Sequence, residues 1–569
     1  MTPFSESSPR LPSESFEIYN ENTRYHKKMS KKDSETQLSV LPFDLDNRFV
    51  AGAKFFNYEH LGALREGGEV SLFSKDQHGI LAAMFASNLA YGMLGYCLRP
   101  ALPRSLGFHF DEPPFGPFFL TILPLSLCFF FGMLSDSVPI ANYRRKPYMI
   151  IGIVIAALAL ISLAALSTTV NAKTLSSKYT ASHLLYLFMS LMVVCVAGIV
   201  LVKVSTEARI IELSQREPLR IRGTILINYL LLRTLVECIC TWISAALLRY
   251  NALTNDFATR IHSGWIYGIL CIICLAVIPI IVYRTGEDAV NGTDCDNRLS
   301  NADSINIRGQ KLKRFFRMCH QRAVWQLALF LTFAIITARF KFSNASSVIA
   351  HLVNPKITAM IYIAGGRAAM SFMVMLAWKI WWMNSSWRRF VLCGFLLAVL
   401  LDLIQSLLVL HVRAMRNEIF FYCVQTLSGI TEAIHYIYTL VPAVELAELG
   451  LEGATSGLFS SFCCIISTTM CAICRKMNSD VSTLVSVSPR TVLKVTLLMC
   501  ILALVNGLSA ATVLLLPHQR LDAQQIRAFG GYTRSAPTVL FLIYFGMLFV
   551  ALGLGINFIV ELVRTSLAK

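Results

Sequence analysis

The sequence of 569 residues has few charged side chains, which make up 15% of the chain against about 25% in soluble domains. Hydrophobic residues make up 55% of it and are gathered in runs of about 20 residues. A run of that length is what a helix needs to cross a bilayer core about 30 Å thick. The composition therefore excludes a soluble globular domain and predicts an all-α polytopic membrane protein.

Several kinds of chemical site are missing from the sequence. It has no Walker-type phosphate loop, so an ion gradient or the solute gradient is favoured over ATP as a driving force. Cys271 and Cys274, like Cys471 and Cys474, have C-x-x-C spacing but lie inside hydrophobic runs, with no second pair or histidine set to complete a metal site. No Ser/His pair or paired His/Asp suggests an enzyme. We expect no metal, no cofactor and no catalytic residue.

The net charge of +17 does not indicate a nucleic-acid partner, because the basic residues lie in loops between hydrophobic runs. That placement suits anionic lipid headgroups and the positive-inside rule. Residues 1–78 are polar and resemble neither a cleavable signal peptide nor an acid-poor transit peptide. We expect a mostly disordered cytoplasmic tail there, and the lack of a transit peptide favours the plasma membrane.

Thirteen segments are predicted to be membrane helices, with boundaries uncertain by a few residues. They are 79–99, 117–136, 147–167, 184–205, 223–248, 264–283, 323–342, 356–382, 388–411, 418–441, 453–474, 491–516 and 537–562. Six helices, a basic inner loop and six more are the arrangement of major facilitator transporters, whose halves rock about a central cavity. The thirteenth is either an added helix that places the C-terminus outside or a segment lying in the membrane interface.

The predicted domains follow from this count. They are a tail at 1–78, an N-terminal six-helix bundle at 79–283, a cytoplasmic central loop at 284–322, a C-terminal six-helix bundle at 323–516, and an inner loop with the added helix at 517–569. The central loop contains a basic amphipathic segment suited to the inner membrane surface. Its marker residues are Ile307, Lys311, Leu312, Arg314, Phe315 and Phe316.

One motif places a carboxylate at a helix end, followed by a turn and three cations. It reads Gly132-Met-Leu-Ser-Asp136, and then Pro139 to Tyr143-Arg144-Arg145-Lys146. Asp136 can bridge to Arg144, to Arg145 or to a neighbouring helix N-terminus, and so latch one conformation. The alternative is that the three cations only enforce topology.

The whole string from Gly132 to Tyr148 resembles the signature of the folate–biopterin transporter family, G-x-x-S-D-x-x-P-x-x-G-Y-R-R-x-x-Y. Three further matches follow in order along the chain. They are Glu212-Leu-Ser-Gln215-Arg216-Glu217-Pro218 with Arg222-Gly223, then Val444-Glu445-Leu-Ala-Glu448 with Glu452-Gly453 and Gly457, then Leu516-Pro517-His-Gln519-Arg520 with Gly530-Gly531. The resemblance implies a major facilitator fold and transport of folate- or pterin-like organic anions by alternating access. We expect a second latch at Glu445 or Glu448.

The sequence departs from that family at two positions. Leu127 stands where members commonly carry a lysine that enters the second helix, and Asn142 replaces a glycine. Asn tolerates left-handed backbone, so the turn can be kept. The missing lysine leaves two alternatives open, which are a transporter of another solute (amino-acid-like or nucleoside-like) and a transporter-like protein that does not transport.

Ionisable residues at membrane depth come from both halves, as a binding site between repeats requires. Arg233 and Glu237 lie four residues apart on one helix face, and Arg367 and Glu432 lie in the second half. We expect Arg233 to bind an anionic group of the solute, while Glu237 or Glu432 takes up a proton or hydrogen-bonds an amino-pyrimidine edge. The alternative is that Arg233 and Glu237 only pair with each other. Asp402, like Arg367, suits a structural role.

Other polar residues complete the predicted site. Asn88 and Tyr91 could line the cavity, with Tyr91 offering a flat face to a planar ring. His435, one turn from Glu432, is either a core histidine with its hydrogen bonds satisfied or a proton carrier. Lys203 is expected to extend to the headgroups. The expected partners are a small-molecule solute and the lipid bilayer, and the sequence does not indicate an oligomeric state.

Overall fold

The computed structural model describes residues 62–105, 122–169, 178–251, 256–288, 301–477 and 489–568, all of which belong to one unit, residues 59–569. These residues are mostly helical and include one two-stranded hairpin. Among them, eleven helices are long and apolar enough to cross a membrane. The predicted all-α polytopic class is confirmed.

The first half begins with α3, which continues through a π-helical turn into α4. Its elements are α3 (His78–Met93), η2 (Leu94–Leu98), α4 (Arg99–Ser105), α6 (Cys128–Ser137), α7 (Lys146–Thr169), α8 (Lys178–Ser214), α9 (Thr224–Leu247), β1 (Leu248–Asn251), β2 (Asp256–Thr259) and α10 (Ser263–Arg284). The antiparallel strands β1 and β2 form a hairpin between α9 and α10.

The second half repeats the plan and adds helices after it. Its elements are α12 (Arg322–Arg339), α13 (Ser343–Val353), α14 (Ile357–Ala377), η3 (Trp378–Trp382), α15 (Trp387–His411), α16 (Glu418–Leu427), α17 (Gly429–Leu446), α18 (Glu452–Met477), α19 (Pro489–Thr512), α20 (Arg520–Phe529) and α21 (Ala536–Ala568). Between the halves lies α11 (Asn301–His320). Short 3₁₀ turns occur at Lys75–Gln77, Arg413–Met415 and Val513–Leu515.

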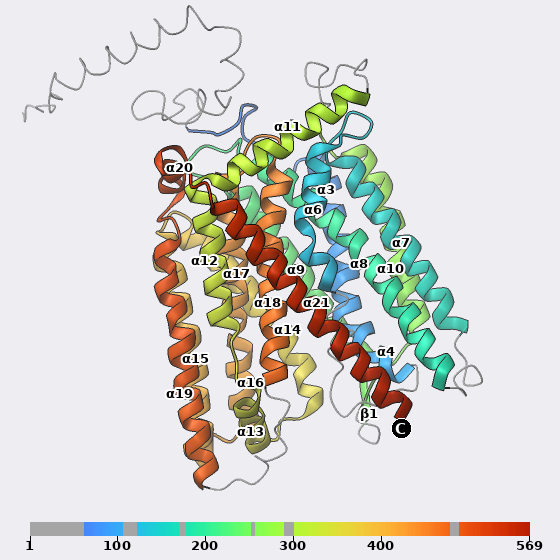
Figure 1. Ribbon diagram of the computed structural model, residues 1–569. Coiled ribbons are helices and arrows are strands. Elements are labelled where there is room, and N and C mark those ends of the chain that lie inside the picture. The colour runs from blue at the N-terminus through green and yellow to red at the C-terminus, as the bar shows by residue number, and fades with distance from the viewer. Residues whose placement is uncertain are drawn as a thin grey trace, which may run out of the picture. The chain divides into compact units, whose positions relative to one another are not determined.

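The two ends of the bundle differ (Figure 1). Helices α11 and α20 lie across one end, together with residues 62–77, and we call this the α11 end. The hairpin and the C-terminal end of α21 lie at the opposite end, which we call the hairpin end. Helix α21 contains a membrane-length apolar stretch, Ala536–Asn557, and packs against α18 as it crosses the bundle obliquely.

The halves meet mainly along two pairs of helices, α6 against α18 and α9 against α14, and α8 also contacts α18. Glycine makes the first contact close. A Cβ on Gly457 would lie 2.6 Å from the carbonyl oxygen of Cys128, and one on Gly132 would overlap the backbone of Gly453. Small residues let membrane helices approach in this way, so these glycines fix how the first half sits on the second.

Two predicted membrane segments are wrong as single helices. The segment 117–136, described from residue 122, is interrupted at Leu127, whose φ of −100° and ψ of 11° leave the helical range. The segment 418–441 is divided at Ser428 into α16 and α17, and the second part extends to Leu446. There Gly429 lies against the backbone of Arg367, and its carbonyl accepts a hydrogen bond of 2.7 Å from Ser371 Oγ on α14.

Part of the predicted disordered tail packs onto the bundle. Residues 1–61 lie outside the described residues, but residues 62–77 are placed at the α11 end. The backbone nitrogens of Leu64 and Arg65 donate to the carbonyl of Gln215, at 2.9 and 3.1 Å, and Leu72 is fully buried. The prediction of a disordered tail is therefore wrong for these residues. A polar composition does not reveal the backbone hydrogen bonds that they form with the loop after α8.

Candidate functional site

A cavity of about 270 Å³ lies between the two halves, and we call it the central cavity. It is lined from the first half by α3, the segment before α6, α8 and α9, and from the second half by α17 and α18. Of the predicted binding residues, Asn88, Tyr91 and Arg233 line it, as does His435. Asn88 Nδ2 donates to the carbonyl of Met84 at 2.8 Å, which leaves its side-chain oxygen available to a ligand.

Arg233 pairs with a carboxylate that the sequence did not single out. Its Nη1 lies 2.9 Å from Oε1 of Glu207 on α8, and Lys203 Nζ lies 3.8 Å from the same oxygen. All three side chains line the central cavity. The alternative pairing of Arg233 with Glu237 is not the ion pair that forms, and Lys203 faces the cavity instead of extending to the headgroups.

Tyr436 joins the two halves beside this ion pair. The guanidinium of Arg233 lies over the ring of Tyr436 on α17, 5.1 Å from its centroid. The Tyr436 hydroxyl donates to Glu237 Oε2 at 3.4 Å, and the hydroxyl of Tyr96 donates to Oε1 at 3.0 Å. Glu237 is not among the residues that line the cavity. Its carboxylate therefore holds the Tyr436 hydroxyl from outside the cavity.

At the α11 end, Asp136 and Arg145 form an ion pair with a nitrogen–oxygen distance of 2.5 Å, and both side chains are fully buried. The Asp136 carboxylate also accepts from the backbone nitrogens of Gly453 and Ala454, at 3.3 and 2.6 Å, in the first turn of α18. Negative charge is favoured at a helix N-terminus. Asp136 therefore connects α6 of the first half to α18 of the second.

Arg145 holds three carboxylates together. Besides Asp136, its Nε lies 3.0 Å from Glu212 and its Nη2 lies 3.1 Å from Glu452. Burial opposes the charge on this guanidinium, but the three carboxylates outweigh it and raise the pKa of Arg145 above its ordinary value. The backbone nitrogens of Arg144 and Arg145 both donate to Glu287 Oε1 at 2.8 Å, but only the Arg145 side chain is fully buried. Between the two predicted partners of Asp136, the structure places Arg145 against it.

Of the two glutamates predicted for the second latch, Glu445 joins the halves. Glu445 accepts from Arg222 Nη1 at 2.8 Å and from Gln524 Nε2 of α20 at 2.6 Å. Glu448 lies 3.8 Å from Arg527 Nη2 and accepts from Gln321 Nε2 at 3.1 Å. Sequence reasoning gave no partner for either glutamate, because the partners come from distant segments.

The model of the BT1 family, the folate–biopterin transporters, matches residues 119–528. The chain belongs to the BT1 family. This BT1 protein is thus a multi-pass membrane transporter whose partners are a small-molecule solute and the lipid bilayer. No curated protein matches the sequence.

The fold of this BT1 protein is similar to that of a solved transporter structure. A D-xylose–proton symporter is similar with a TM-score of 0.50 at 10% identity, over 77% of this chain and 97% of that one. A major facilitator superfamily transporter, FucP, in its outward conformation gives a TM-score of 0.47 at 14% identity, over 77% and 98%. The predicted major facilitator arrangement of six and six helices is confirmed, with α21 added.

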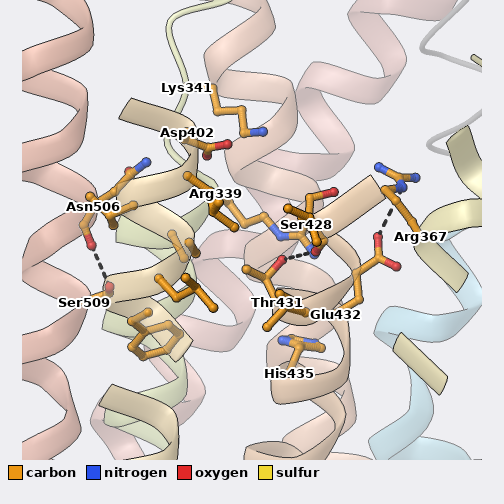
Figure 2. A pocket seen from close by; sticks show the side chains of 18 of the residues that line it. Arg339, Lys341, Arg367, Asp402, Ser428, Thr431, Glu432, His435, Asn506 and Ser509 are labelled. Atoms are coloured by element: carbon orange, nitrogen blue, oxygen red, sulfur yellow. Dashed lines mark hydrogen bonds and ion pairs between the residues drawn. The ribbon is translucent and has the colours of Figure 1, made fainter. Parts of the chain in front are cut away.

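The remaining predicted residues of the BT1 protein lie in a second cavity (Figure 2). Arg367 and Glu432 face each other there, with 3.8 Å between Nε and Oε1, and Asp402 lines the same cavity on the side of Lys341. Neither Arg367 nor Glu432 lines the central cavity, so the structure does not bring them to Arg233. His435 lines both cavities, and its Nδ1 lies 2.7 Å from the hydroxyl of Tyr438.

Among the described residues, no group of three or more histidines, cysteines or acidic residues gathers where it could hold a metal ion. The residues that sequence reasoning missed are Glu207 as the partner of Arg233, and Tyr436. A signal for Glu207 was present, since an acidic residue four positions after Lys203 falls on the same helix face. For Tyr436 there was none, because aromatic residues make up 11% of the chain.

Proposed function

We propose that this protein is a secondary transporter of a folate- or pterin-like organic anion and works by alternating access, with the α11 end in the cytoplasm of a plasma-membrane protein. The observation that carries the proposal is the group of charges in the central cavity. Of the described residues that line it, Lys203 and Arg233 are cationic and Glu207 alone is acidic. The surplus of positive charge favours an anionic solute in a site away from bulk water.

The same cavity offers aromatic surface for a planar ring. Tyr91 lines it from the first half and Tyr436 from the second, so a ring bound between them contacts both halves. Leu127, which replaces the family lysine, is not among the lining residues. Lys203 supplies a cavity cation in this chain, and the loss of the family lysine therefore does not remove the positive charge that an anion needs.

Alternating access requires that the closed end opens. In the present arrangement the α11 end is closed by Asp136 with Arg145 and by Glu445 with Arg222, so the cavity is loaded from the hairpin end. The solute leaves after these latches separate and the halves rock. The basic residues of the loops at the α11 end support placing that end in the cytoplasm.

We assign the coupling ion as a proton and Glu207 as its carrier, in place of Glu237, Glu432 or His435. Glu207 is 1% exposed, and its Oε2 has no hydrogen-bond partner while Oε1 holds the two cations. Protonation of Glu207 removes the attraction that occupies Arg233 and Lys203. Both cations then become available to the solute, which links proton binding to solute binding.

The test is uptake of labelled folate by a folate-auxotrophic host or by proteoliposomes. Arg233→Gln and Lys203→Gln should each lower uptake about tenfold or more, since a lost charge-assisted hydrogen bond is worth about 1.5–3 kcal/mol. Arg249→Gln, which removes an exposed arginine of the hairpin, is the matched control and should leave uptake unchanged.

Competing solutes separate the proposal from its alternatives. Excess biopterin should reduce folate uptake, because both rings use the central cavity. Saturable uptake of another organic anion that excess pterin does not reduce would assign a different cargo. Solute binding without any uptake would instead assign a receptor that does not transport. Full uptake by the Arg233→Gln variant would show that the solute does not bind at the proposed site.

A further inference from the structure

Residues 62–72 contact both halves at the α11 end, and we call them the N-terminal strap. The side chains of Ala63, Leu64 and Leu72 are buried, so the strap is packed into the bundle. It lies before the first membrane helix, and the transport mechanism proposed above gives it no part. Its contacts nevertheless fall on the groups that close the α11 end.

One residue of the first half ties the backbone of the strap to the second half. The carbonyl of Gln215 accepts from the backbone nitrogens of Leu64 and Arg65, at 2.9 and 3.1 Å. The side-chain nitrogen of Gln215 donates to the carbonyls of Val444 and Ala447 in the second half, at 3.1 and 3.0 Å. The strap is therefore attached where the two halves already touch.

Gly62 brings the strap to the latch formed by Arg222 and Glu445, which we call the second latch. Nη2 of Arg222 donates to the carbonyl of Gly62, while Nη1 lies 2.8 Å from Glu445. The Arg222 side chain is fully buried, and a buried donor without an acceptor costs free energy. The strap and Glu445 thus satisfy the same guanidinium when the α11 end is closed.

Arg65 brings a further charge to the latch around Arg145, which we call the first latch. Its Nη1 lies 3.5 Å from Glu452 in the second half and 3.9 Å from Glu212 in the first. Arg145 gathers three carboxylates, and in the described part of the chain the other guanidinium paired with them is that of Arg209. Arg65 makes the guanidiniums equal in number to the carboxylates. Without it, Glu212 and Glu452 repel each other across the interface, at a site with little water.

We propose that the N-terminal strap is an autoinhibitory clamp, which holds the α11 end closed while it is docked and leaves before the halves separate there. This inference rests on the proposed function, in which the α11 end opens, and adds a regulatory element to it. The Arg65 side chain is 25% exposed whereas that of Arg145 is fully buried. Releasing Arg65 therefore costs less than breaking the pairs of Arg145, which makes the strap the removable part of the latch.

Two variants release the strap by different physical means. Arg65→Gln removes the charge and keeps the backbone. Gly67→Ala keeps every charge but places a Cβ at a φ of 115°, which residues other than glycine rarely adopt. Arg65→Lys keeps the charge and should behave as the wild type. Lys75→Gln is the matched control, because it removes an exposed cation just beyond the strap.

Hydrogen-exchange mass spectrometry of the purified full chain measures the opening directly. The backbone nitrogens of Gly453 and Ala454 donate to Asp136, and these hydrogen bonds break when the first latch separates. Arg65→Gln should speed exchange at these amides about two- to fivefold, the range for a partly exposed ion pair. Gly67→Ala should speed it about tenfold, as a left-handed backbone conformation at alanine implies. Lys75→Gln should leave it unchanged.

The amides of the hairpin strand β1 are the internal reference and should not exchange faster in either variant. Equally faster exchange at both ends would indicate a loss of overall stability and would overturn the clamp. Unchanged exchange at Gly453 and Ala454 in either variant would overturn it as well, since the strap would then only cover the surface. The measurement needs no solute. If the wild type transports neither folate nor biopterin, the proposed function fails and the exchange rates still decide the role of the strap.

Discussion

The two halves contact each other through different chemistry at the two ends of their interface. At the α11 end, Asp136, Arg145 and Glu452 form a buried network across α6 and α18. At the hairpin end, the contact is apolar, with the ring of Trp242 on α9 lying 6.1 Å from that of Tyr362 and packed on Gly365 of α14.

This difference bears on how the halves move. A buried ion pair is costly to desolvate, so its net free energy is small although its geometry is specific. The ion pairs can therefore align the two halves in one specific arrangement at the α11 end and still separate when that end opens. Apolar contacts such as that of Trp242 have little directionality, so the hairpin end can slide without leaving a charge unpaired. The comparison predicts that charge changes at one end act far more strongly than truncations at the other.

The largest effect is expected from Arg145→Leu. The substitution leaves Asp136, Glu212 and Glu452 buried without their cation, and breaking a buried ion pair by removing one partner costs about 3–5 kcal/mol. Thermal denaturation of the purified protein should show a large loss of stability, together with impaired uptake.

Arg144→Leu, one residue earlier, is the matched control and should cost less, because the Arg144 side chain is only half-buried. Adding Asp136→Asn to Arg145→Leu should recover part of the loss by removing one unpaired carboxylate. Equal destabilisation by Arg144→Leu and Arg145→Leu would show that the network around Arg145 does not close the α11 end.

An intermediate effect is expected when the second latch is broken. Glu445→Gln and Arg222→Gln each remove one partner of a buried pair at 2.8 Å. A double-mutant cycle should give a coupling free energy of about 1.5–3 kcal/mol, the range for hydrogen bonds to charged groups. Gln524 also donates to Glu445. We therefore expect Gln524→Ala to lower the coupling free energy between Arg222 and Glu445. A double-mutant cycle without a coupling free energy would show that Glu445 is not part of the latch.

The smallest effect is expected from Trp242→Ala at the hairpin end. Trp242 is 48% exposed, and an aromatic pair adds about 0.5–1.5 kcal/mol beyond its buried area. Thermal denaturation should therefore detect a minor loss, with Trp265→Ala, which truncates a more exposed tryptophan, as the control. A loss as large as that of Arg145→Leu would contradict the difference between the two ends.

Hydrophobic runs predicted most membrane helices well, because the need to satisfy backbone hydrogen bonds in lipid acts locally. Helices α7 and α15 begin and end within two residues of the predicted 147–167 and 388–411. The interruptions at Leu127 and Ser428 were not predicted, because Leu127 lies in a hydrophobic run and the break at Ser428 depends on Ser371 and the close approach of α14. Helices α13 and α20 also escaped prediction, since they are short and lie outside the hydrophobic runs.

The sequence by itself determined the class of protein and the family, since these follow from composition and from motifs. Only the tertiary structure decided the partners. Arg233 pairs with Glu207 on the neighbouring helix instead of Glu237 one turn away, and Arg367 with Glu432 in a separate chamber. The reason is physical, because hydropathy sets the depth of a residue, whereas helix rotation and close packing at glycines set the direction in which its side chain points.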